Sequence, residues 1–130
     1  DDFRVKLSDE EVEKIKKDIT DRLEDRQKEA MRDVWKRLYD VVKHMADKVK
    51  DKEAGKNVAL HPTIVENIVD LCDMLPKLNL TGDQELDNMA KEVKQSITKY
   101  PVDDIRDYDN IRKHVINEAD KLLSKMDGFI

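Results

Sequence analysis

Helix-breaking residues are scarce in this sequence, which has three glycines and three prolines in 130 residues. Aromatic residues make up only 5%, and runs of β-branched residues are nearly absent, whereas Lys, Glu, Asp, Leu and Met are abundant. This mixture favours helix throughout the chain. A chain of this length is typical of one domain. We therefore expect a single all-α domain that spans residues 1–130.

Cysteine and long apolar runs are also lacking. Cys72 is the single cysteine, so no disulfide can form within the chain, and this usage fits a reducing compartment. No apolar run approaches the roughly 20 residues that a membrane-spanning helix needs. The N-terminal sequence DDFRVKLSDE has no apolar core of a signal peptide. We expect a cytoplasmic protein with no membrane partner.

A large excess of one charge is absent too: 25 basic and 30 acidic residues give a net charge of −5. This balance argues against a protein whose main role is to grip a nucleic-acid backbone. A local basic cluster on the long helix, near two aromatic residues, leaves weak nucleic-acid binding as an alternative, although acidic residues interleave with it. The cluster comprises Arg22, Arg26, Lys28, Arg32, Lys36, Arg37 and Lys43.

Residues 9–53 contain neither glycine nor proline, and their apolar residues recur in steps of three and four. Ser8 followed by Glu11 is the signature of a capping box at a helix start. The alternation Phe3, Val5, Leu7 predicts that residues 1–8 form an extended arm. Gly55 is expected to end the long helix.

One helix over 9–53 would be roughly 65 Å long, which exceeds a compact domain of this size. Either the helix breaks near 24–29, or its first half meets another chain, and the near-heptad spacing favours the second interpretation. A binding surface is therefore predicted on this helix. Its apolar and aromatic residues are Val12, Ile15, Ile19, Leu23, Trp35 and Tyr39, the last two lying between core and partner roles.

Three shorter helices are predicted at 62–75, 84–99 and 107–126, with Pro76 ending the first and Gly128 ending the last. The expected architecture is bundle-like, with the long N-terminal helix packed against these three. The stretch VDLCDMLPKLNLTGDQELD (69–87) is interpreted as an inner corner of the fold rather than a ligand site. Its residues Leu71, Leu75 and Leu78 should then be buried.

Side chains that could support catalysis or bind a metal do not form a recognisable motif. His44, His61, His114 and Cys72 share no short ligand spacing, so we predict no metal and no cofactor. A second set lies on one face of the helix at 62–75 and could bind a cation or act in acid–base chemistry, but a solvated face is the favoured interpretation. That set is Glu66, Asp70 and Asp73.

The pair Arg37 and His44 lies two turns apart on one helix face. This spacing resembles, at its loosest limit, the Arg-x4–6-His pattern of HEPN-superfamily ribonucleases. The resemblance implies a dimer cleft in which His is the acid or base and Arg stabilises the phosphate. Leu38 stands where that pattern has a polar residue, so a surface arginine and a partly buried histidine are the favoured interpretation.

The segment ENIVDLCDMLPKLNLTGDQELDNMAKEV, preceded by VVKHMADKVKDKEA and followed by SKM, resembles an uncharacterised helical family of bacteriophages and mobile elements. Some of its members are encoded near MoxR-type ATPase genes. The resemblance covers most of residues 30–126 and implies a phage or bacterial cytoplasmic setting, without assigning residue roles. Together these observations predict a non-enzymatic helical interaction module whose partner is a protein or a second copy of the chain.

Overall fold

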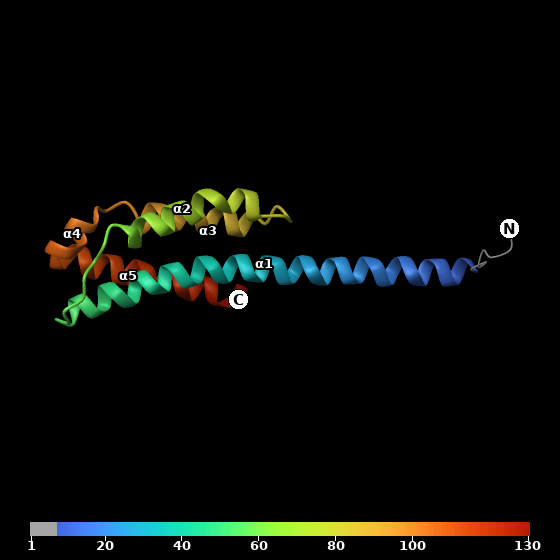
Figure 1. Ribbon diagram of the computed structural model, residues 1–130, viewed down its shortest axis with the longest axis horizontal. Helices are drawn as coiled ribbons and strands as arrows, with labels where there is room; N and C mark the ends of the chain where they lie inside the picture. The colour runs from blue at the N-terminus through green and yellow to red at the C-terminus, as the bar shows by residue number, and fades with distance from the viewer. Residues whose placement is uncertain (1–7) are drawn as a thin grey trace. The chain divides into compact units, whose positions relative to one another are not determined.

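A computed structural model describes residues 8–130 of the chain (Figure 1). These residues form helices joined by short loops and contain no β-strand, which confirms the all-α prediction. Apart from Ser8, the predicted arm at 1–8 lies outside the described residues. The helices are α1 (Asp9–Glu53), α2 (Thr63–Leu78), α3 (Gln84–Ser96), α4 (Val102–Asp107), α5 (Asp109–Met126) and the 3-10 helix η1 (Asp127–Phe129).

Helix α1 is continuous, with no break at 24–29, and both of its ends are set by local chemistry. At the start, the backbone N–H of Glu11 donates to Ser8 Oγ at 3.1 Å, as the predicted cap requires. At the end, Gly55 adopts a φ of 82°, a conformation that glycine tolerates best. The N–H groups of Gly55 and Lys56 donate to the carbonyls of Lys52 and Asp51, which is the Schellman pattern.

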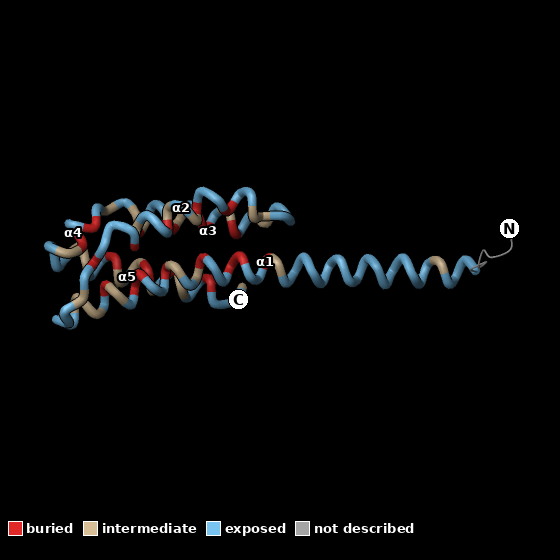
Figure 2. Tube along the Cα trace, in the orientation of Figure 1, coloured by how far each residue is buried: buried red, intermediate tan, exposed pale blue. Residues whose placement is uncertain are grey.

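By their contacts the residues divide into two units, 1–30 and 31–130, and each is described by itself. In the first unit, the described residues are exposed except for the partly buried Val12 and Ala30 (Figure 2). In the second unit, one face of α1 belongs to the hydrophobic core. Its buried residues are Met31, Val34, Trp35, Leu38, Val42, Met45, Ala46 and Val49.

The core of residues 31–130 joins this face of α1 to apolar side chains from every other α-helix. Helix α3 packs against α2 and α5, and α4 packs against α5. Side chains with no exposed surface at its centre include Leu38, Ile68, Leu86 and Val115. No polar or charged residue among those described is buried, so the packing of this unit rests on apolar contact.

The prediction that Pro76 ends the second helix is wrong, because α2 continues to Leu78. Proline lacks an N–H, so residue 76 cannot donate to the carbonyl four residues earlier, yet the residues after it still can. The N–H of Asn79 donates to the Leu75 carbonyl at 2.9 Å. Leu75 is fully buried, and Leu71 and Leu78 are partly buried against the core, so the interpretation of this stretch as a corner holds.

The C-terminal third differs from its predicted boundaries. Helix α3 ends at Ser96 rather than 99. An additional helix, α4, forms between the predicted helices at 84–99 and 107–126, and the extended backbone of Tyr108 separates it from α5. Arg112 stabilises this junction by donating to the carbonyls of Ile105 and Arg106, at the end of α4, and to Glu53 Oε2 at 2.7 Å.

Helix α5 ends at Met126, as predicted, but Gly128 does not adopt the left-handed conformation of a helix-ending glycine and lies within η1. The chain continues to wind because the ring of Phe129 stacks on that of Trp35, with centroids 4.1 Å apart and an interplanar angle of 9°. The indole N–H of Trp35 donates to Asp83 Oδ2 at 3.2 Å. Asp83 Oδ1 accepts from the backbone N–H of Glu85 and thereby caps α3.

Replacing Leu75 with alanine should destabilise the fold, because its side chain has no exposed surface. The expected loss in free energy of unfolding is about 2–5 kcal/mol. Leu80→Ala is the matched control: this side chain is 71% exposed, so its removal should change stability by no more than about 0.5 kcal/mol. Urea denaturation measures both, and equal effects of the two changes would show that Leu75 does not lie in a packed corner.

Asp83→Ala should remove two interactions at once. Loss of the cap costs about 0.5–2 kcal/mol, and the indole N–H left without an acceptor costs about 1–3 kcal/mol more. The same change in a Trp35→Phe background should cost less, since only the cap is then lost. A double-mutant cycle by chemical denaturation gives the coupling. An identical cost in both backgrounds would mean that the indole–carboxylate hydrogen bond contributes nothing.

Candidate functional site

The most exposed apolar surface of α1 is the N-terminal stripe, defined as Val12, Ile15, Ile19 and Leu23. The side chains of Ile15, Ile19 and Leu23 are 45%, 53% and 54% exposed, and Val12 is partly buried. Their spacing of three, four and four residues puts them on one side of a helix. Charged residues occupy most of the remaining surface of this segment. Such a surface can bury apolar area against another helix.

The two aromatic residues predicted to belong to this binding surface, Trp35 and Tyr39, lie in or against the core of residues 31–130 instead. Trp35 is only 2% exposed and stacks on Phe129 within the core of residues 31–130. Tyr39 is partly buried and packs against the same core. Trp35 therefore serves as a core residue, and almost none of its surface is accessible to a partner.

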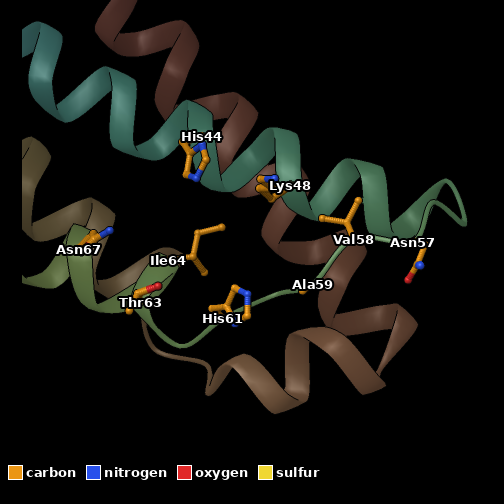
Figure 3. Close-up of a pocket in the computed structure, with 9 residues that line it drawn as sticks. All are labelled: His44, Lys48, Asn57, Val58, Ala59, His61, Thr63, Ile64 and Asn67. Carbon is orange, nitrogen blue, oxygen red and sulfur yellow. The ribbon is translucent and has the colours of Figure 1, made fainter.

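Arg37 and His44 are both exposed on α1, and the structure does not bring them to one pocket. His44 lines a pocket of about 480 Å³ that Arg37 does not line (Figure 3). Helix geometry separates the two positions by about 10 Å along the axis. A cleft between two copies of the chain is what the HEPN-like interpretation would need.

We define the His44–His61 pocket by the residues that line it. His44 and Lys48 come from α1, and the opposite side is formed by the segment before α2 and by the first turns of that helix (Figure 3). None of the lining residues carries a carboxylate. They are His44, Lys48, Asn57, Val58, Ala59, His61, Thr63, Ile64 and Asn67.

Sequence patterns did not reveal this pocket, because the apolar periodicity of α1 does not show that the segment before α2 lies opposite His44 and Lys48. One signal was present. Residues 54–65 contain no acidic residue, in a chain where 30 of 130 residues are acidic. A local lack of acid beside a histidine and a lysine is a recognisable feature, although it does not say which helix lies opposite.

Among the described residues, no three histidine, cysteine or acidic side chains converge as a metal site would require. His114 lies edge-on to the ring of Tyr100, with centroids 5.8 Å apart, so it is separate from the pocket. Burial raises the pKa of the Cys72 thiol to about 11. The thiol therefore stays protonated near neutral pH, and a protonated thiol is a poor nucleophile and metal ligand.

The three carboxylates on α2 are exposed, as expected for a solvated face. Asp73 pairs with Lys94 of α3 at 2.7 Å, and this hydrogen bond raises the pKa of Lys94. Glu66 and Asp70 are likewise exposed. The three carboxylates do not converge as the ligands of one cation would.

The basic cluster on α1 is exposed and mixed with acidic residues. Lys43, for example, pairs with Asp47 at 3.4 Å. Neutralisation of this kind lowers the local positive potential on which phosphate-backbone binding depends.

Comparison with known proteins gives no relative for this chain: no family model, no curated protein and no solved structure matches it. The resemblance to a phage and mobile-element family therefore stays a prediction. None of the described helices combines the length and apolarity that a membrane-spanning helix needs.

Proposed function

We propose that this chain is a non-enzymatic helical interaction module that associates with a second copy of itself through the N-terminal stripe. The observation that carries the proposal is the exposure of Ile15, Ile19 and Leu23, each about half accessible, on one side of a helix. The resemblance noted in the sequence motivates a phage or bacterial cytoplasmic setting as part of this proposal.

The spacing of the stripe suits a helix–helix contact. Val12, Ile15 and Ile19 follow the a, d, a positions of a heptad, while Leu23 lies one residue beyond the next d position. Val12 and Leu23 are 11 residues apart. Residues with this spacing lie on the same face of an almost straight helix. A second helix could follow this face over about three turns.

Charges beside the stripe are compatible with a second copy as the partner. Glu11 and Lys16 lie on opposite flanks of the stripe and five residues apart. In a parallel pair of helices, side chains at this separation on opposite flanks meet across the contact. Glu11 of one copy would then face Lys16 of the other, which favours association over repulsion.

The expected association is weak. A contact made by four side chains from each copy falls at the small end of protein interfaces, below about 1,200 Å². Loss of translational and rotational freedom opposes such a contact, so only part of the apolar gain remains as affinity. The dimer should therefore form and dissociate in the micromolar range, and its population should depend on protein concentration.

Neither alternative function has a specific observation in its favour. The HEPN-like interpretation needs Arg37 and His44 to act at one site, and only His44 lines the pocket. The nucleic-acid interpretation needs an unneutralised basic face, and acidic residues interleave with the cluster on α1. Apolar association needs only the exposed stripe.

Ile19→Asp should abolish self-association, because a carboxylate would have to be buried at the centre of the contact. Light scattering on the unmodified chain should show a mass that rises from 15.2 kDa toward twice that value as concentration increases. The variant should stay at the chain mass. Circular dichroism should change little, since Ile19 is exposed within its own chain.

Thr20→Asp is the matched control. It adds the same charge one residue later, about 100° around the helix, on a side chain that is also exposed. This variant should associate like the unmodified chain. A clean monomer of the unmodified chain throughout the micromolar range would refute the proposal, and equal losses in both variants would show that charge rather than the stripe controls association.

A further inference from the structure

The His44–His61 pocket has the chemistry of an anion site. Its lining supplies one ammonium group, two imidazoles, two side-chain amides and one hydroxyl, and no carboxylate. Figure 3 shows His44 and Lys48 on α1 and His61 on the segment before α2. All of these groups can donate hydrogen bonds, whereas an anion supplies only acceptors. Every lining residue belongs to the unit 31–130, and the pocket is separate from the N-terminal stripe.

The carboxylates of α1 nearest Lys48 have other lysines as partners. The two carboxylates of α1 that flank Lys48 are engaged with other lysines: Asp47 with Lys43 and Asp51 with Lys56, both at 3.4 Å. Among residues 8–130, no carboxylate oxygen lies within 4.0 Å of the Lys48 ammonium group. Its ammonium group is therefore available to a bound anion, which a partly buried lysine would bind more strongly than a fully solvated one.

One part of the wall is apolar. Ile64 is 9% exposed, Val58 is partly buried, and the exposed Ala59 also lines the pocket. The volume of about 480 Å³ exceeds that of a simple ion and falls within the range of small-molecule sites. A ligand that suits both parts carries an anionic head and a carbon body.

We infer that the His44–His61 pocket binds a small phosphate monoester, with its phosphate against Lys48 and the two imidazoles and its carbon body against Val58 and Ile64. A phosphate group offers three acceptor oxygens and nearly two negative charges, which suit a lining that has several donors and no carboxylate better than a carboxylate ligand does. The lining also includes the amides of Asn57 and Asn67. This inference does not depend on self-association.

Phenyl phosphate is a suitable probe, with inorganic phosphate and benzoate as comparison ligands. Titration followed by NMR at constant ionic strength should shift signals of the pocket residues first, with saturation below about 1 mM. Phenyl phosphate should bind more tightly than inorganic phosphate, because its ring buries apolar surface. It should also bind more tightly than benzoate, because the carboxylate carries less charge and fewer acceptors.

Lys48→Ala should weaken phenyl phosphate binding about tenfold or more, the loss expected for one charge-assisted hydrogen bond. Lys36→Ala is the matched control, since it removes the same charge from an exposed position of α1 outside the pocket. His61→Ala gives a second test, because this exposed residue precedes α2 and is not needed for helix formation.

Equal weakening by Lys48→Ala and Lys36→Ala would overturn the inference, because binding would then follow overall charge. Shifts spread along α1 without saturation, or inorganic phosphate binding as tightly as phenyl phosphate, would also overturn it. Circular dichroism on each variant separates a loss of binding from a loss of folding.

Discussion

The packing of the second unit depends on a buried apolar core to which one face of α1 contributes Leu38, Val42, Met45 and Val49. None of these four side chains has any exposed area. Burying one such side chain contributes roughly 1.5–3 kcal/mol. The ion pairs nearby are weaker by comparison: Lys50 and Asp120, at 2.8 Å, are each nearly half exposed, and such pairs contribute at most about 1 kcal/mol. Apolar contact in the core that α1 shares with the shorter helices therefore contributes more to this unit than the ion pairs do.

Polar contacts then specify how the segments between helices are arranged. The indole of Trp35 meets a carboxylate that also caps α3, so one residue of the turn, Asp83, links two elements. Arg112 has a similar role at the other end of the unit, where it holds the last carbonyls of α4 beside Glu53. These groups contribute specificity of arrangement rather than most of the stability.

The features predicted from the sequence are those with local causes. Ser8 and Gly55 act on their own helix ends, and the apolar period of three and four residues identifies α1, α2, α3 and α5. Features with distant causes were missed. Gly128 lies within η1, where the neighbouring Phe129 stacks on Trp35. Helix α4 buries Val102 and Ile105 in the core. Short-range patterns contain neither contact.

The candidate sites divide in the same way. Exposure of Ile15, Ile19 and Leu23 followed from helix length, since a helix of 45 residues is longer than one compact core. The His44–His61 pocket did not follow, because it depends on how the segment after α1 and the start of α2 lie beside His44 and Lys48. Only its local lack of acidic residues was visible beforehand.

Helix α1 contributes residues from Met31 onward to the core, and we propose that the N-terminal stripe before them binds another copy. Amide hydrogen exchange at low and high protein concentration tests this division most directly. Amides near Leu38 to Val49 should exchange slowly and at the same rate in both samples, because their protection comes from the fold. Amides near Ile15 to Leu23 should exchange more slowly in the concentrated sample. Exchange in that segment that is independent of concentration would contradict the account.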